Sequence, residues 1–136
     1  MRARRGSARL EIVARVVDAS ALIAVGYMEP RAAMVEDLLG DHELHAPALL
    51  SYEWANVAAR KMSEHPGRVE ELRGQARMLG ERTVTLHDVD VLAVIDLAHE
   101  TGLTAYDAAY LWLAEALGAD LVTLDGLLAR VAASRR

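Results

Sequence analysis

The stretch LTAYDAAYLWLAEALGADLVTLD, residues 103–125, does most to decide the fold of this chain. Residues 106–117 are almost entirely apolar with only two charges, Asp107 and Glu115, which predicts a buried helix. Residues 121–124 then predict a short buried strand, and residues 126–133 a last helix. A buried helix that leads directly into a buried strand is typical of an α/β protein.

The rest of the chain continues this alternation of strands and helices. Strands are predicted at residues 12–17, 43–46, 83–86 and, very short, 103–104. Helices are predicted at residues 20–25 with Ser20 as N-cap, 32–39, 47–62 opened by Pro47, 68–79, and 88–100 with Val91, Val94, Ile95 and Ala98 on one face. The pattern predicts a parallel sheet with helices on both faces. No internal repeat or long linker divides the chain, so we expect one domain over residues 13–136 and a basic extension over residues 1–12.

Composition narrows the class of protein. The chain has 136 residues, 53% of them hydrophobic and 26% charged, which fits a soluble domain with its own core. It has no cysteine, which excludes disulfides and thiolate metal sites and fits a reducing, cytoplasmic compartment. No apolar run reaches the roughly 18 residues that span a membrane, and the basic start does not fit a signal peptide.

Charge is distributed unevenly along the chain. Residues 1–15 carry five arginines against Glu11, although the net charge of the whole chain is -5. The remainder is therefore strongly acidic, which argues against a broad positive surface that binds nucleic acid. It does not exclude a nuclease whose bound cations offset its own acids.

Four acids stand alone in the most apolar stretches: Asp18, Glu53, Asp107 and Asp125. An isolated carboxylate is costly in apolar surroundings unless a cation or hydrogen bonds compensate it. Asp18 and Asp125 follow predicted strands, and Asp107 follows the short strand predicted at 103–104. The carboxyl ends of parallel strands share one edge of a sheet, where sites form in such folds. We therefore expect three of the four acids at that edge.

Each acid also has a purely structural explanation. Asp18 can begin a turn, and Asp125 before Gly126 reads as a turn or N-cap. Glu53 is predicted in mid-helix, where it cannot cap, but a pair with Arg60 is open to it. Thr104 and Asp107 fit a capping box, and the helix dipole favours an acid in a first turn.

The joint placement of the acids points to a divalent cation. Two unit charges 4 Å apart repel by about 4 kcal/mol at an effective dielectric of 20. Four carboxylates in one cleft therefore need cations, unless some stay protonated. All-oxygen ligands suit Mg²⁺ or Mn²⁺ better than zinc, and such ions activate water for attack on a phosphodiester.

The order of VVDASALI (16–23), LLSYEWANV (49–57) and the stretch at 103–125 resembles the PIN-domain ribonucleases, and among them the VapC-like toxins of type II toxin–antitoxin systems. The resemblance covers about residues 13–131. It implies a three-layer α/β/α sandwich with a parallel sheet of four or five strands. It also implies an Mg²⁺- or Mn²⁺-dependent endoribonuclease that forms a homodimer and is inhibited by a cognate antitoxin.

By this resemblance the metal and catalytic residues are Asp18, Glu53, Asp107 and Asp125, with Ser20 and Thr123 in support. Asp18 and Asp107 are then the central metal ligands. Glu53 is a ligand or positions the attacking water, and Asp125 is a second-metal or outer-shell ligand. The first acid usually lies within the first ten residues in this family, so Asp18 stands later than usual.

Two other functions fit parts of the sequence. A phosphohydrolase would use Asp18 as a covalent nucleophile, but this class usually has a second aspartate where this chain has Ser20. A non-catalytic α/β interaction module is the other reading.

The aromatic residues of the two central helices, such as Tyr110, are interpreted either as core or as a dimer or antitoxin surface. The five histidines are interpreted as ordinary surface residues, whereas Arg60 and Lys61 either contact RNA phosphates or simply lie at the surface.

Overall fold

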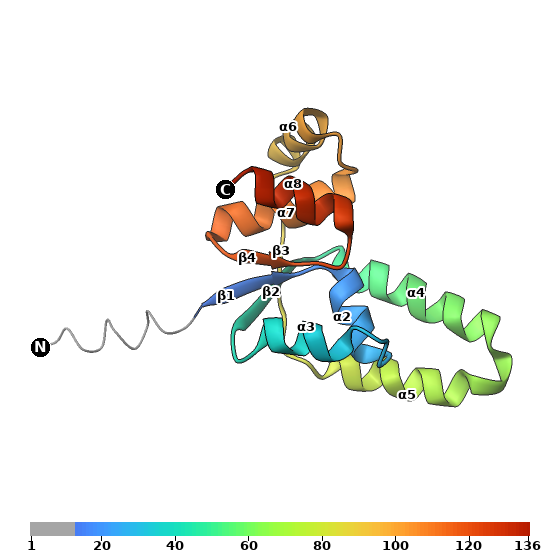
Figure 1. The fold of residues 1–136 in the computed structure, drawn as a ribbon. Helices are drawn as coiled ribbons and strands as arrows, with labels where there is room; N and C mark the ends of the chain where they lie inside the picture. The colour runs from blue at the N-terminus through green and yellow to red at the C-terminus, as the bar shows by residue number, and fades with distance from the viewer. Residues whose placement is uncertain (1–12) are drawn as a thin grey trace, which may run out of the picture.

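The computed structural model describes residues 13–136 and confirms the α/β class, with a four-stranded parallel sheet (Figure 1). The strands are β1 (Ala14–Val17), β2 (Glu43–Pro47), β3 (Thr85–His87) and β4 (Asp120–Val122). They lie in the order β3-β2-β1-β4, and every neighbouring pair is parallel. The extension predicted for residues 1–12 lies outside the described residues, and the single domain over 13–136 stays a prediction.

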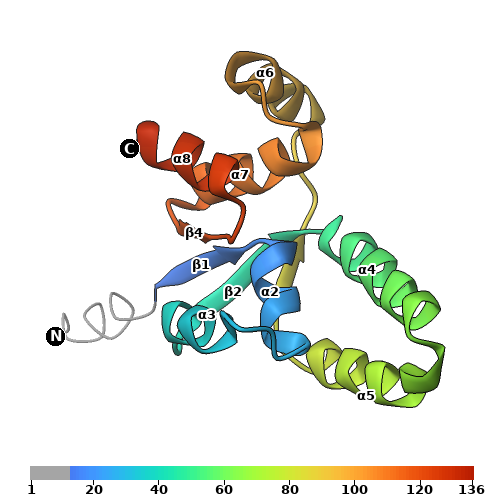
Figure 2. The same ribbon diagram turned by 45° about the vertical axis from the view of Figure 1, so that its right-hand side comes forward.

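Helices cover both faces of the sheet (Figures 1 and 2). On one side lie α6 (Val91–Thr101), α7 (Ala105–Leu117) and α8 (Gly126–Ser134). On the other side lie α2 (Ala19–Gly26), α3 (Ala32–Leu39) and α5 (Val69–Gly80), with α4 (Leu50–Glu64) packed on α2 and α5 and joined to α5 by the short helix η1 (Pro66–Arg68). No helix of residues 13–136 is long and apolar enough to cross a membrane.

Helix α7 forms the centre of one layer because it is apolar almost all the way round. It contacts β1, β2 and β4 as well as α6 and α8, and Tyr110 and Ala108 are fully buried. The helix ends at Gly118, whose φ of 62° is the left-handed conformation that glycine adopts without strain. The amide of Ala119 then donates to the carbonyl of Ala114 at 2.9 Å, which closes the helix and turns the chain into β4.

Three local predictions were wrong. Pro47 does not open a helix but ends β2, where its missing N–H is tolerated, and α4 begins only at Leu50. Residues 103–104 form no strand, because the Thr104 side chain N-caps α7 by accepting from the Asp107 amide at 3.1 Å. Ser20 does not cap α2, which begins at Ala19 with no side-chain cap bond.

Helix α6 buries only part of the predicted face, namely Val94 and, partly, Ala98. Val94 and Leu97 are buried, whereas Val91 and Ile95 are 63% and 52% exposed. The reason is that α6 packs mainly on α7 and not on the sheet, which rotates its contact stripe. The exposed residues therefore form an apolar strip on the surface.

The histidines are not all ordinary surface residues. His45 on β2 and His87 on β3 are half-buried, and their Nδ1 and Nε2 atoms form a hydrogen bond of 2.8 Å. The Nε2 atom of His45 lies 3.3 Å from the carboxylate of Glu43. The pairing of the two strands brings these rings together, and their separation in the sequence hid the contact.

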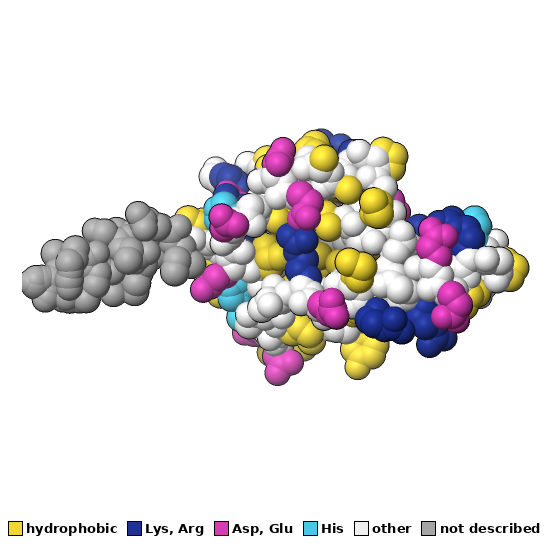
Figure 3. All heavy atoms as spheres, turned by 90° about the horizontal axis from the view of Figure 1, so that it is seen from below, with side chains coloured by type: hydrophobic (Ala, Val, Ile, Leu, Met, Phe, Trp, Pro, Cys, Tyr) yellow, Lys and Arg dark blue, Asp and Glu magenta, His cyan; other side chains and the backbone are white. Residues whose placement is uncertain are grey.

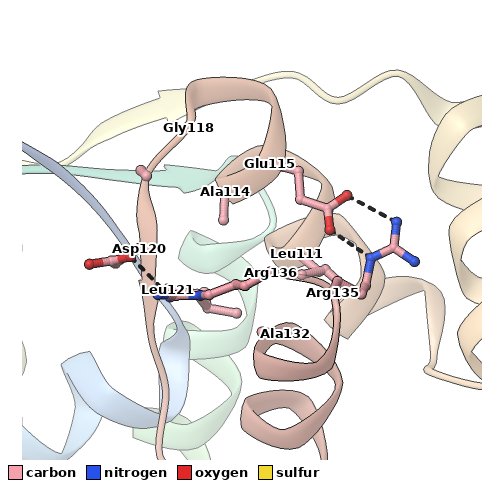
Figure 4. Close-up of a pocket in the computed structure, with 10 residues that line it drawn as sticks. Leu111, Ala114, Glu115, Gly118, Asp120, Leu121, Ala132, Arg135 and Arg136 are labelled. Atoms are coloured by element: carbon pink, nitrogen blue, oxygen red, sulfur yellow. Dashed lines mark hydrogen bonds and ion pairs between the residues drawn. The ribbon is translucent and has the colours of Figure 1, made fainter.

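Charged side chains gather in two places on the surface. Seen from the side of α3 and α5, Lys and Arg side chains collect toward the end where α4 and α5 meet (Figure 3). At the amino end of β4, Arg135 contacts Glu115 at 2.6 Å and Arg136 contacts Asp120 at 2.9 Å (Figure 4). Arg135 also contacts Glu100 at 3.2 Å. These pairs border a hollow of about 260 Å³ and tie the end of α8 to α7 and β4.

We expect the core under α8 to carry much of the stability. Leu128 is fully buried, whereas its neighbour Leu127 is 51% exposed. Leu128→Ala should lower the free energy of unfolding by about 2–5 kcal/mol through lost burial and the cavity left behind. Leu127→Ala is the matched control and should cost less than about 1 kcal/mol. Urea unfolding measures both, and equal losses would contradict this account of the core.

Candidate active site

The acids meet at the carboxyl edge of the sheet, beyond β1 and β4. Asp18 follows β1 directly, and its amide donates to the carbonyl of Val122, the last residue of β4, at 2.9 Å. Asp125 lies three residues past the end of β4 and begins α8. Two of the acids are thus placed there by strands, as predicted.

Asp18 is the most buried of the four, with 5% of its surface exposed. Its Oδ2 atom accepts from the Ser20 hydroxyl at 2.8 Å and from the Thr123 hydroxyl at 2.6 Å. Both hydroxyls also accept backbone hydrogen bonds, from Leu124 to Ser20 and from Asp125 to Thr123, each at 3.0 Å. The two supporting residues predicted from the sequence therefore fix one oxygen of Asp18 and anchor the turn after β4.

Glu53 lies in the first turn of α4, not in mid-helix as predicted, because the helix begins at Leu50. Its partner is also not Arg60. The hydroxyl of Tyr110 on α7 donates to Glu53 Oε1 at 2.7 Å. Sequence reasoning missed this role and treated Tyr110 only as a packing or surface aromatic. A tyrosine in an apolar helix was the available signal, since a buried tyrosine hydroxyl usually needs a partner.

Asp107 and Asp125 belong to the site and also lie at the starts of α7 and α8. Asp107 is the third residue of α7, and its amide is bound by Thr104. The Asp125 carboxylate N-caps α8 by accepting from the Leu128 amide at 2.9 Å. Asp107 reaches the edge through the start of α7, not through the strand predicted at 103–104.

The four carboxylates interact electrostatically. Burial raises the pKa of Asp18, hydrogen bonds from Thr123 and Ser20 oppose this, and the charge of Asp125 adds to it. Burial also raises the pKa of Glu53, against the Tyr110 hydrogen bond, and the charges of Asp18 and Asp107 raise it further.

The pKa of Asp107 is raised in the same way, first by burial and then by the charges of Asp18 and Asp125. The structure thus brings all four predicted residues into one electrostatic cluster. Among residues 13–136, the causes of these three shifts are burial, hydrogen bonds and the charges of neighbouring carboxylates.

This donor set fits a hard divalent cation. Within residues 13–136, no three Asp, Glu, His or Cys side chains stand close enough together to enclose a metal ion by themselves. Mg²⁺ does not need such a cage, since it usually keeps several waters and is held by one or two carboxylates. An anionic cluster whose members raise one another's pKa attracts a cation of this kind.

The fold and the site together define the class of protein. It is a parallel α/β domain in which one edge of the sheet is acidic and attracts cations. Residues 15–134 match the model of the PIN domain family, and the chain belongs to this family. It is 37% identical over 119 residues to Ribonuclease VapC3 of Pyrobaculum aerophilum, covering 84% of this chain and 91% of that protein. The crystal structure of PAE2754 from the same organism matches with a TM-score of 0.69 and 30% identity, over 85% of this chain and 82% of that one.

We expect Asp18→Asn to raise the melting temperature in the absence of divalent cations. A carboxyl whose pKa is raised on folding favours the fold below its ordinary pKa and opposes it as pH rises through the folded-state pKa. Removing the charge should therefore stabilise the protein at pH 7.5, by on the order of 3 °C, and less at pH 5.

Thermal unfolding with chelator present, at both pH values, measures the effect. Asp96→Asn on the exposed face of α6 is the matched control and should change little at either pH. A loss of stability in Asp18→Asn that is the same at pH 5 and pH 7.5 would show that its hydrogen bonds outweigh the burial of its charge.

Proposed function

We propose that this chain is a metal-dependent endoribonuclease whose active site is formed by Asp18, Glu53, Asp107 and Asp125. The observation that carries the proposal is the cluster of carboxylates at one edge of the sheet, in which burial and neighbouring carboxylates raise the pKa of Asp18, Glu53 and Asp107. The similarity to Ribonuclease VapC3 over most of both chains supports RNA as substrate.

We assign each residue a role from its surroundings. Asp18, with one oxygen fixed by Ser20 and Thr123, and Asp107 at the start of α7 are the central ligands for Mg²⁺ or Mn²⁺. When bound, the cation supplies charge stabilisation for the phosphodiester and a more acidic water. Asp125 serves as an outer or second ligand, and its cap bond to Leu128 keeps it at the start of α8.

Glu53 is the residue best placed to orient the attacking water. Tyr110 holds its Oε1 atom at 2.7 Å, so the carboxylate is positioned without a neighbouring cation. Its raised pKa makes it a better proton acceptor than an ordinary glutamate.

A covalent phosphohydrolase mechanism is less well supported. Oδ2 of Asp18 is engaged by two hydroxyls, and Lys61, the only lysine of the chain, contacts Glu29 at 3.4 Å. A phosphate bound at Asp18 would thus lack the lysine that such enzymes use.

In the cell, we propose that the enzyme acts as the toxin of a toxin–antitoxin pair in the cytoplasm, forms a homodimer and is inhibited by a cognate antitoxin. The VapC name of the relative supports this role. Of the aromatic residues considered as a partner surface, Tyr110 is fully buried and takes no part in one.

The purified chain, free of antitoxin, should cleave single-stranded RNA with Mg²⁺ or Mn²⁺ and stop when EDTA is added. Asp18→Asn and Asp107→Asn should each lower the cleavage rate at least about 100-fold while circular dichroism shows the fold intact, since each removes a charge that acts in the transition state. Asp96→Asn should cleave like the unchanged chain. Failure of the unchanged chain to cut RNA with either cation would favour the non-catalytic interaction module.

Cation binding should also be visible without any substrate. Mn²⁺ at about 100 times its Kd should stabilise the fold by about 2.7 kcal/mol at pH 7.5, because it binds the folded state selectively. The gain should shrink toward pH 5, where protons compete for carboxylates of raised pKa. It should vanish in the Asp18→Asn/Asp107→Asn double variant, and an equal gain in that variant would place the cation elsewhere.

A further inference from the structure

Two surface hollows of different chemistry flank the acids. One, of about 510 Å³, is lined by Tyr52, Glu53, Asn56 and Tyr106, and we call it the aromatic hollow. The other, of about 330 Å³, is lined by Arg31, Arg60 and Lys61 together with Ser20, Ile23, Glu29, Val57, Leu124 and Asp125, and we call it the basic hollow. Each contains a member of the acidic cluster, Glu53 in the first and Asp125 in the second.

Asp18 lies between the two hollows. It is hydrogen-bonded to Ser20, which lines the basic hollow, and its charge raises the pKa of Glu53, which lines the aromatic hollow. Helix α4 borders both, because Glu53 and Arg60 are seven residues apart, or about 10 Å along the helix axis. A chain-like ligand that crosses the acids therefore meets aromatic rings on one side and cations on the other.

The aromatic hollow presents two tyrosines to solvent. Tyr52 and Tyr106 are 78% and 66% exposed, and each directly precedes an acid of the site, Glu53 or Asp107. Consecutive residues of a helix point in different directions, so the acid turns toward the cluster while the ring stays outside. Exposed aromatic rings beside a nuclease site are suited to stacking on unpaired bases, whose faces are all accepted.

The basic hollow contains two arginines free to bind an anion. Lys61 is already engaged, since it contacts Glu29 at 3.4 Å and lies 5.0 Å from the centre of the Tyr27 ring. Within residues 13–136, neither Arg31 nor Arg60 forms an ion pair, unlike Arg15, Arg68, Arg82 and Arg135. Guanidinium groups bind phosphate through two parallel hydrogen bonds.

From this arrangement we infer that the enzyme binds an unpaired RNA strand across the acids, with a base stacked on Tyr52 and Tyr106 and a neighbouring phosphate held by Arg31 and Arg60. The inference rests on the proposed ribonuclease function and adds four binding residues and the direction in which the strand lies. A protein partner in the aromatic hollow would have to bury Glu53, which lines it, whereas charged residues are depleted at the core of protein interfaces.

The aromatic contact is tested by binding to two labelled strands in the Asp18→Asn background, which keeps the RNA intact. One strand is a twelve-residue oligouridylate, and the other is the same backbone without bases. Tyr52→Ala and Tyr106→Ala should each weaken binding of the first by about 5- to 100-fold, as expected for a lost stack, and leave the second unchanged. Tyr52→Phe and Tyr106→Phe should bind like the parent, since phenylalanine keeps the ring.

The basic contact is tested by the salt dependence of the same binding reaction. Arg31→Gln and Arg60→Gln should weaken both strands equally, and each should reduce the slope of log K against log salt by about 0.7. Arg73→Gln, at an exposed position of α5 outside both hollows, is the matched control and should leave the slope unchanged.

Equal losses on both strands for the tyrosine variants would overturn the stacking contact, and slopes like that of Arg73→Gln would overturn the phosphate contact. If the tyrosine variants instead shift only the monomer–dimer equilibrium in sedimentation, the aromatic hollow belongs to a second copy of the chain. The proposed function is judged separately, because cleavage by the unchanged chain with Mn²⁺ does not depend on either result.

Discussion

The contact between the Asp18 carboxylate and the hydroxyls of Ser20 and Thr123 is the constraint on which the rest of the structure depends. It joins the end of β1 to the turn after β4, more than a hundred residues further along the chain. A buried carboxylate is costly unless hydrogen bonds compensate it, and here two short ones do so at a single oxygen. The acid is thus kept in an apolar layer in a fixed orientation, and the edge of the sheet around it becomes a place of concentrated negative charge.

Two more acids lie at that edge because they stand at the starts of helices, where they also have local structural roles. Asp125 caps α8 through its side chain, and Asp107 occupies the third position of α7 behind the Thr104 cap. The positive end of a helix favours an ionised acid, whereas burial and neighbouring carboxylates oppose it. For Asp107 the opposing effects prevail, since its pKa is raised. Capping and site formation are therefore two uses of the same residues.

Much of the fold and the position of the site follow from the sequence because they depend on local pattern. The alternation of apolar strands and helices predicts the parallel sheet, and lone acids after β1 and β4 predict the edge where they meet. What failed depends on partners distant in the chain. Pro47 is compatible with a helix start or a strand end, and only the pairing of β2 decides. The Tyr110–Glu53 bond and the exposed face of α6 are likewise set by packing that periodicity does not encode.

The histidine pair at the edge of the sheet has a consequence for how β3 finds its place. In neutral rings, the Glu43 carboxylate beside Nε2 of His45 fixes the proton there, so Nδ1 accepts and Nε2 of His87 donates. The two rings must then adopt complementary tautomers. A three-residue edge strand such as β3 has few ladder bonds to define its alignment, and a slip by one residue would turn His87 to the opposite face. The polar chain Glu43–His45–His87 thus helps to fix the register in which β3 pairs with β2.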